Sequence, residues 1–317
     1  MRSLLKSFRF PAASCHRKLT SSPNLSFVPD HESATREEVH KLQQLMCASS
    51  SVLVLTGAGI STECGLPDYR SERVGLFART NHKPITLQEF VSNRDRRKAY
   101  WARNFIAWPK FSVFEPGIAH ETLSEWQKIG KVSRIITQNV DRLHQKAGSK
   151  DVIELHGNGF TVGCLNCSYT TSRQDFQAEL TLLNADWLKE WEAKSAPLLA
   201  MRPDGDVQLE ERDALSFQVA SCPSCGGMLK PKVVFFGENI PKAVVEESCA
   251  LTDDTDLLLV IGSSLHVFSG YRFVCRAQDQ KKGIVIVNIG PTRADHMTDI
   301  VFLRRRAGDL LPRVSIS

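Results

Sequence analysis

Residues 52–61 read Val52-Leu53-Val54-Leu55-Thr56-Gly57-Ala58-Gly59-Ile60-Ser61, an apolar run that ends at two glycines separated by one residue. The run predicts a buried parallel strand, Val52 to Leu55, and the glycines predict a turn whose backbone N–H groups can approach a pyrophosphate. The dinucleotide fingerprint is incomplete, because Thr62 occupies the third glycine position and the expected acidic residue about 20 residues later is missing. An ordinary dehydrogenase is therefore a poor match. Taken alone, the loop could equally be a tight turn without a ligand.

Strand and helix patterns alternate outward from this loop. Further apolar runs, which predict buried parallel strands, lie at residues 132–137, 257–261 and 284–289. Helical periodicity is found at residues 37–48, 119–128 and 271–280. This alternation predicts an α/β fold with a doubly wound, Rossmann-like parallel sheet. Residues 68–117 interrupt it and are expected to form an inserted helical module, and residues 157–231 interrupt it a second time.

The second interruption contains four of the nine cysteines, spaced as Cys164-x-x-Cys167 and Cys222-x-x-Cys225. In a chain without a secretory signal, this spacing predicts one tetrahedral Zn²⁺. Four thiolates leave no position for water, so the zinc is expected to be structural. The gap of 54 residues, 168–221, is far longer than the ~15–20 usual between such pairs. It is either a decoration of the zinc module or a loop that reaches the active site.

The positive charge of the chain is concentrated at its N-terminus. The formal net charge is +5, and residues 1–29 hold five Lys and Arg residues and no acidic residue, so the remainder is neutral. A neutral body gives no electrostatic reason to expect a nucleic-acid partner. No apolar run approaches the ~20 residues of a membrane span, so no membrane partner is expected. The Ser-rich, basic stretch 1–29 resembles a mitochondrial presequence, with a disordered basic tail as the alternative.

Several short motifs occur in a fixed order and together resemble the sirtuin family of NAD-dependent protein deacylases. They are Gly57–Ser61, Gly65–Arg70, Thr137–Asp141, Glu154–Gly157, the two cysteine pairs, Val234–Glu238, Gly262–Leu265 and Asn288–Gly290. The resemblance covers roughly residues 37–312. The sequences of three further segments are most similar to the mitochondrial sirtuin-4 type. They are Val74–Arg79, Tyr100–Phe105 and Gly290–Arg293.

The resemblance implies how the chain divides into domains. An NAD-binding Rossmann-like domain would comprise residues 37–67, 118–156 and 232–312. Residues 68–117 would supply a helical module with a cofactor-binding loop, and residues 157–231 a zinc-binding module with its long insert.

The resemblance also implies the position of the co-substrate NAD. The glycine loop would hold the pyrophosphate, Asp68 to Arg70 would cover the nicotinamide, and Gln138 to Asp141 would line the pocket of the attached ribose. The full set of implied NAD contacts is Gly57, Ala58, Gly59, Ile60, Ser61, Thr62, Pro67, Asp68, Tyr69, Arg70, Phe77, Gln138, Asn139, Val140, Asp141, Gly262, Ser263, Ser264, Asn288, Ile289, Gly290 and Ala307. At the position of Ala307, many sirtuins have a cysteine near the adenine.

By the same resemblance, His156 is the general base, assisted by Asn139 and Asp141. Imidazole suits this role because its unperturbed pKa of about 6.5 lets it accept a proton at neutral pH. The acyl oxygen of the modified lysine would attack the ribose carbon that bears nicotinamide, and His156 would then deprotonate a ribose hydroxyl. The products would be nicotinamide and O-acyl-ADP-ribose. A buried structural histidine is the alternative reading of His156.

The presequence would direct the chain to the mitochondrial matrix, and the expected substrates are acyl-lysine proteins, in particular mitochondrial metabolic enzymes. The substrate backbone would lie extended between two segments, as in β-augmentation. The implied substrate contacts are Val234, Phe235, Phe236, Gly237, Glu238 and Leu265. Many sirtuins have a glutamine at the position of His266, beside the expected peptide-binding groove.

Tyr100 and Arg103 resemble a Tyr-x-x-Arg pair with which sirtuin-5-type enzymes bind acidic acyl chains. Residues three apart share one helical face, and a guanidinium can pair with a carboxylate at two points. They suggest a preference for acyl groups larger than acetyl, of methylglutaryl or lipoyl type. An ordinary half-exposed helix face is the alternative. Two other functions use the same parts: protein mono-ADP-ribosylation, and a weakly catalytic NAD-sensing scaffold.

Overall fold

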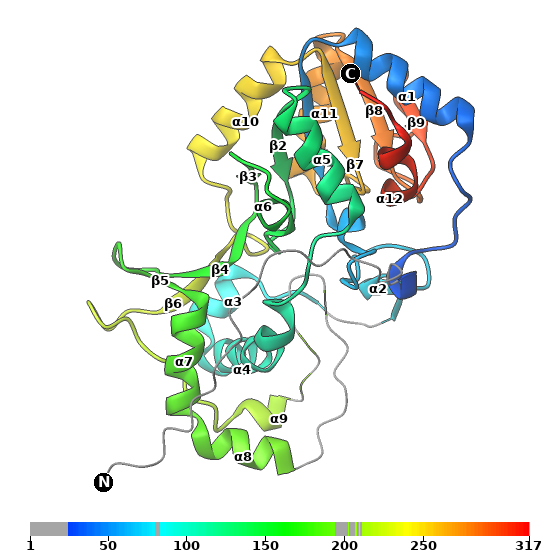
Figure 1. Cartoon of the computed structure of the whole chain (residues 1–317). Helices are drawn as coiled ribbons and strands as arrows, with labels where there is room; N and C mark the ends of the chain where they lie inside the picture. Colours follow the sequence, from blue (N-terminus) through cyan, green and yellow to red (C-terminus); the bar gives the residue numbers. More distant parts are fainter. Residues whose placement is uncertain are drawn as a thin grey trace.

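A computed structural model describes residues 25–79, 83–193, 202, 207, 209 and 211–316 (Figure 1). The predicted presequence lies outside the described residues as far as residue 24, so it stays a prediction. Within the described ranges, none of the helices combines the length and the hydropathy that a membrane span requires.

The larger part of the molecule is built on a six-stranded sheet of order β3-β2-β1-β7-β8-β9, with every neighbouring pair parallel. The strands are β1 (Val52–Thr56), β2 (Val132–Thr137), β3 (Ile153–Glu154), β7 (Leu257–Ile261), β8 (Gly283–Val287) and β9 (Val301–Leu303). From the central β1–β7 pair, β2 and β3 follow in chain order towards one edge of the sheet, and β8 and β9 follow towards the other. The carboxyl ends of β1 and β7 therefore flank the switch point where such sheets bind ligands.

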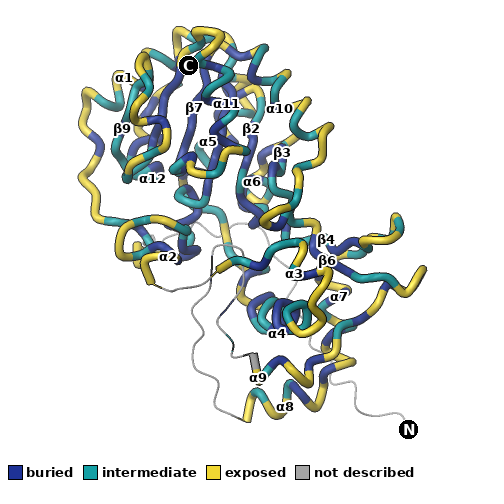
Figure 2. Tube along the Cα trace, turned by 180° about the vertical axis from the view of Figure 1, so that it is seen from behind, coloured by how far each residue is buried: buried dark blue, intermediate teal, exposed yellow. Residues whose placement is uncertain are grey.

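Helices cover both faces of this sheet, which explains why its central strands are apolar throughout. Val52 and Val54 of β1 point into one core with α1 and α5, whereas Leu53 and Leu55 point into a second core with α11. Every residue of β1 and β7 is buried, as Figure 2 shows for β7. The covering helices are α1 (Arg36–Ala48), α5 (Ile118–Lys128) and α12 (Ala307–Leu310) on the first face, and α10 (Lys242–Asp254) and α11 (Phe268–Asp279) on the second. The predicted fold class is confirmed.

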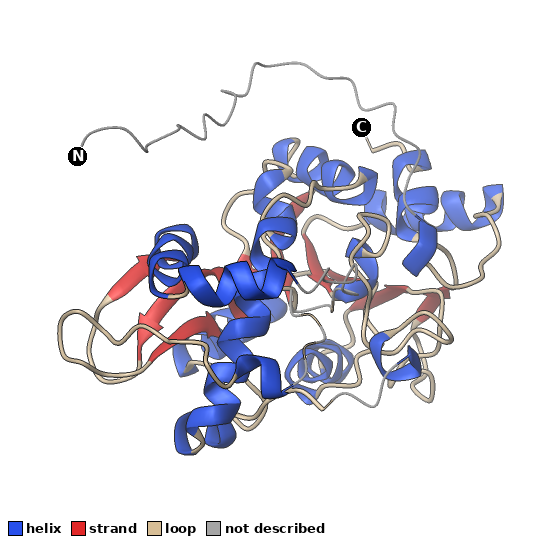
Figure 3. Ribbon diagram, turned by 90° about the horizontal axis from the view of Figure 1, so that it is seen from below, coloured by secondary structure: helices blue, strands red, loops and turns tan. Residues whose placement is uncertain are grey.

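The smaller part contains a three-stranded antiparallel sheet of order β5-β4-β6, which lies apart from the large sheet (Figure 3). Its strands are β4 (Gly157–Cys164), β5 (Thr170–Ser172) and β6 (Leu229–Val233). The helices around it are α3 (Leu87–Ser92), α4 (Arg94–Phe111), α7 (Arg173–Leu183), α8 (Ala185–Ala193) and α9 (Glu211–Ala214). Helix α4 supplies its central side chain, Trp101, whose indole N–H donates to the Leu229 carbonyl oxygen at 3.1 Å.

The insert at 168–221 contributes to this smaller core. Phe176 and Trp187 on α7 and α8, together with Phe217, pack with Phe105 of α4. Among the described residues of the insert, none lines the large cavity described below. The part of the insert that the structure describes thus behaves as a decoration of the zinc module.

The domain boundaries inferred from the sequence remain our proposal, and the distribution of apolar contacts supports them. One core joins α3 and α4 to the zinc module, whereas two other cores flank the six-stranded sheet. A fourth cluster, which includes Leu66, Trp108 and Leu143, lies where the two parts meet. The remaining short helices are α2 (Leu76–Arg79), α6 (Leu143–Lys146) and the 3₁₀ turns Leu25–Phe27, Ala58–Ser61 and Leu311–Arg313.

Candidate active site

A cavity of about 1160 Å³ opens at the carboxyl ends of β1, β7 and β8. Its walls come from the glycine loop after β1, the segments that follow β7 and β8, and two loops at residues 68–73 and 233–238. It therefore lies at the switch point of the sheet and also borders the strand β6 of the smaller part.

Three glycines interlock at the floor of this cavity. A Cβ atom on Gly57 would lie 2.8 Å from the carbonyl oxygen of Gly262, and so would one on Gly59. Gly262 has a φ of 60°, and a Cβ there would lie 2.3 Å from the backbone nitrogen of Ile60. The two loops approach so closely that only glycine fits. Gly57, Gly59 and Gly262 line the cavity, whereas Ile60 and Ser61 lie behind its wall.

Asn139 and Asp141 support the glycine loop from behind. The Asn139 amide donates to the Gly57 carbonyl oxygen at 3.1 Å and to Ser61 Oγ at 3.2 Å, and Ser61 Oγ donates to Asp141 at 2.7 Å. Asn139 also lines the cavity, but Asp141 does not. Burial raises the pKa of the Asp141 carboxyl group. Asp141 is therefore linked to the cavity through Ser61 and the glycine loop, and its contact with NAD stays a prediction.

The loop that begins at Asp68 folds over one side of the cavity. The Asp68 carboxylate accepts hydrogen bonds from the backbone N–H groups of Arg70, at 3.0 Å, and Ser71, at 2.7 Å. Phe77 lies behind the loop, with its ring centroid 5.8 Å from that of Tyr69 and 5.5 Å from the Arg70 guanidinium carbon. Asp68, Tyr69 and Arg70 line the cavity, and Phe77 and Pro67 do not.

His156 lines the cavity and lies two residues after the end of β3. Its Nδ1 is 2.9 Å from the backbone carbonyl oxygen of Gln138, and its Nε2 is 2.8 Å from Ser269 Oγ. Burial lowers the pKa of His156, an effect that the Gln138 hydrogen bond opposes. The imidazole is therefore neutral at neutral pH and holds a lone pair on one nitrogen. Such a group can accept a proton from a ligand in the cavity.

The segment 234–238 is fixed by an ion pair between Lys230 and Glu238. The two charged groups are 3.0 Å apart, and Glu238 also accepts the backbone N–H of Phe235 at 2.8 Å. On its outer edge Phe236 forms a parallel bridge with Thr86. Leu265, in the segment that follows β7, is buried with a φ of 55°, and both segments line the cavity.

The structure does not place Tyr100 or Arg103 among the residues that line this cavity. Tyr100 is buried, and its ring centroid lies 5.1 Å from that of Phe235, which does line the cavity. Arg103 is half-buried on the same helix. The remaining predicted residues in the wall are Ala58, Thr62, Gln138, Val140, Val234, Gly237, Ser263, Ser264, Asn288, Ile289, Gly290 and Ala307.

Several cavity residues carry no recognisable signal in the sequence. They are Pro29, Asp30, Arg73, Ser269, Arg305 and Arg306. Asp30 and Arg73 pair at 3.5 Å, and Arg306 pairs at 2.9 Å with the buried Glu63. These contacts join segments that are far apart in the chain, so no local pattern could indicate them.

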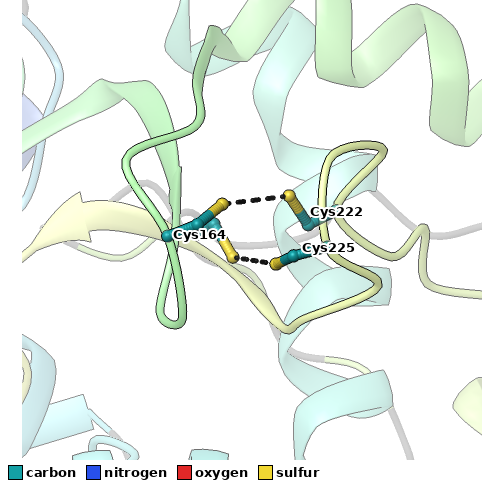
Figure 4. Close-up of side chains that lie close together, drawn as sticks. Cys164, Cys222 and Cys225 are labelled. Carbon is teal, nitrogen blue, oxygen red and sulfur yellow. Dashed lines mark hydrogen bonds between the residues drawn. The ribbon is translucent and has the colours of Figure 1, made fainter.

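The four cysteines of the two Cys-x-x-Cys motifs converge between β4 and β6 (Figure 4). All four sulfur atoms lie within 4.8 Å of one another, with Cys164 to Cys225 at 3.5 Å and Cys167 to Cys222 at 3.7 Å. Disulfide sulfurs would be only about 2.05 Å apart. Four Zn–S bonds of about 2.3 Å place tetrahedral sulfurs roughly 3.8 Å apart. The thiols are therefore arranged to hold one structural zinc ion.

Comparison with known proteins adds to this geometry. The family model described as "Sir2 family" matches residues 57–269, which include the glycine loop, His156 and all four cysteines. The chain belongs to the Sir2 family. Members of this family, the sirtuins, use NAD, and the cavity at the switch point and the four-thiol cluster agree with the NAD and zinc expected from the sequence.

Curated sirtuins match almost the whole chain. "NAD-dependent protein deacylase Sirt4" of Drosophila melanogaster is 46% identical, over 93% of this chain and 92% of its own. "NAD-dependent protein lipoamidase sirtuin-4, mitochondrial" of Homo sapiens is 48% identical, over 91% of this chain and 89% of its own. A solved structure described as "Sir2-p53 peptide-NAD+" is 27% identical with a TM-score of 0.65, and covers 86% of this chain and 95% of its own.

Proposed function

We propose that this sirtuin is an NAD-dependent protein lysine deacylase that releases nicotinamide and O-acyl-ADP-ribose. The observation that carries the proposal is His156, a neutral imidazole in the wall of a cavity large enough for NAD and an acyl-lysine side chain. Relatives named as deacylases or lipoamidases, at 46–48% identity, support the same activity.

NAD supplies a ribose carbon with a leaving group, and this chain's residues bind it, orient it and move one proton. The glycine loop, which has no side chains at Gly57 and Gly59, lets its backbone lie close to the pyrophosphate, while Gly262 to Ser264 and Asn288 to Gly290 contact the adenosine half. The Asp68–Arg70 loop covers the nicotinamide and excludes water. His156 accepts the proton of a ribose hydroxyl at Nε2, because Nδ1 is occupied by the Gln138 carbonyl oxygen.

The acyl-lysine substrate enters as an extended chain between residues 236–238 and 264–266. Backbone pairing in such a channel depends little on the side chains of the substrate peptide, so selectivity is decided by the acyl group. We propose that acyl groups larger than acetyl, such as methylglutaryl-type and lipoyl groups, are preferred. The lipoamidase names of the bovine and human relatives support this preference.

The relatives named as mitochondrial, together with the basic stretch 1–29, support a mitochondrial location. We further propose the matrix as the compartment and metabolic enzymes as the protein substrates.

A single assay tests the proposed function against its two rivals. Nicotinamide release is measured with NAD alone, with unmodified peptide, and with peptides that carry acetyl, methylglutaryl or lipoyl lysine. A deacylase releases nicotinamide only with acyl-peptide and removes the acyl group in equal amount. Release with transfer of ADP-ribose to unmodified protein would support the mono-ADP-ribosyltransferase, and no release in any mixture would support the scaffold.

Arg103→Met tests the proposed acyl contact. If the guanidinium pairs with an acyl carboxylate, its removal should reduce kcat/KM for methylglutaryl-lysine by roughly 10-fold to 100-fold and leave acetyl-lysine almost unchanged. Arg94→Met is the matched control, because Arg94 is exposed on the same helix α4. Equal losses on both peptides, or none, would remove Arg103 from the acyl site.

A further inference from the structure

Ser269 and His156 are 113 residues apart in the chain but form a hydrogen bond of 2.8 Å in the cavity wall. The other ring nitrogen of His156, Nδ1, faces the backbone carbonyl oxygen of Gln138 at 2.9 Å. Because a carbonyl oxygen can only accept, Nδ1 carries the proton and Nε2 of the neutral ring holds the lone pair. The Ser269 hydroxyl therefore donates to Nε2, the nitrogen that can act as a base.

The start of helix α11, which carries Ser269, is docked against Gln138. A Cβ atom on Gly270 would lie 2.8 Å from Oε1 of Gln138, so the glutamine side chain packs directly on the helix backbone. The same side chain donates to Ser263 Oγ at 2.8 Å and to the Thr56 carbonyl oxygen at 3.2 Å. Gln138 thus holds one side of the imidazole with its backbone and places Ser269 on the other side with its side chain.

We propose that Ser269 is a positioning residue for His156, which holds the imidazole ring in one orientation and one tautomer before and after it takes up a proton. This inference rests on the proposed function, in which His156 is the general base.

A hydroxyl group suits this task because it can donate and accept. In the free protein Ser269 O–H donates to Nε2. When a sugar hydroxyl reaches Nε2, it takes that place, and its proton moves onto the nitrogen. As the sugar departs, the imidazolium Nε2–H can donate to Ser269 Oγ, which rotates about its Cβ–Oγ bond to accept. At Ser269 only hydrogen bonds form and break, because the proton that leaves the sugar hydroxyl is held by His156.

The kinetic test uses the full chain with NAD and the best acyl-peptide. Ser269→Ala removes the hydroxyl and should lower kcat by about 3-fold to 10-fold, the effect of one hydrogen bond, while the Kd for NAD stays unchanged. Ser269→Thr keeps a hydroxyl at the same position and should restore most of the rate. Ser92→Ala, an exposed serine at the end of α3, is the matched control. A weaker Kd for NAD with unchanged kcat would overturn the positioning role and make Ser269 a binding residue.

A spectroscopic test does not depend on activity. In protein labelled with ¹⁵N-histidine, the His156 signals are assigned by their loss in His156→Tyr. Wild-type protein should show a protonated Nδ1 and a bare, hydrogen-bonded Nε2, and in Ser269→Ala the Nε2 signal should shift. A proton on Nε2 in the wild type, or an unshifted Nε2 signal in Ser269→Ala, would overturn the proposal even if the alanine variant folded poorly in assays.

These outcomes separate the inference from the function on which it rests. If His156→Tyr kept its activity, the general-base role would fail, whatever the spectra showed. If His156→Tyr were inactive while Ser269→Ala matched the wild type in kcat and spectrum, only the role of Ser269 would fail.

Discussion

Replacing His156 with tyrosine is expected to lower NAD-dependent deacylation by about 10²-fold to 10⁴-fold, the usual contribution of a positioned general base. The imidazole is neutral because burial lowers its pKa, and the Gln138 carbonyl oxygen holds the ring with the lone pair on Nε2, which can accept a proton. A phenol has a pKa of about 10 and keeps its own proton at neutral pH, so it cannot replace the base.

The measurement combines nicotinamide release with the mass of the acyl-peptide product. His40→Tyr is the matched control, since His40 is exposed on α1 and does not line the cavity. His156→Asn avoids the larger phenol ring, and thermal unfolding should show both His156 variants folded. Deacylation by a folded His156→Asn at the wild-type rate would remove His156 from the mechanism.

The sequence predicted the central sheet well because its strands are buried on both faces. β2 and β7 match the predicted runs 132–137 and 257–261, since an apolar run buried in a parallel sheet is visible without any neighbour. The short edge strands β3 and β9, of two and three residues, are defined by their pairing with β2 and β8, and no pattern in such short segments indicates them. The predicted strand 284–289 ends early, at Val287, because the chain then turns to line the cavity.

The candidate site was predictable only where its residues form a motif. The glycine loop, His156 and the cysteines were named because their spacing matches a family, and the structure brings the first two to one cavity. Ser269 has no such spacing, because its contact with His156 depends on how α11 packs against the loop after β2. Asp141 was named from its motif alone, and the structure adds that it is buried behind the glycine loop and bonded to Ser61.

Helical spacing alone was a weak guide for Tyr100. A separation of three residues places Tyr100 and Arg103 on one face of α4, but it does not say what that face touches. In the structure Tyr100 packs among Phe90, Trp101 and Phe235. Of these three neighbours Phe235 lines the cavity, and a contact between Tyr100 and an acyl chain stays a prediction.

Replacing Cys222 with serine is expected to unfold the smaller part of the molecule rather than to slow the chemistry directly. Cys222 is buried beside Leu229 in the core that joins α4, α7 and the three-stranded sheet. The Cys222 backbone N–H donates to the Gly227 carbonyl oxygen at 2.8 Å, and the Gly226 N–H donates to the Cys222 carbonyl oxygen at 2.8 Å, so the turn is shaped around the thiol. The turn thus presents the sulfur to the other three cysteines.

Structural zinc contributes on the order of 10–16 kcal/mol in small zinc modules, comparable with the whole stability of a domain. The loss of one of four ligands should therefore lower the free energy of unfolding by at least about 4 kcal/mol and release the metal. Zinc content per chain and thermal unfolding measure the two effects, and hydrogen exchange should locate the loss in β4 to β6. Cys47→Ser, which alters an exposed thiol at the end of α1, should change neither. A Cys222→Ser protein with one zinc per chain and wild-type stability would show that these thiols do not form the metal site.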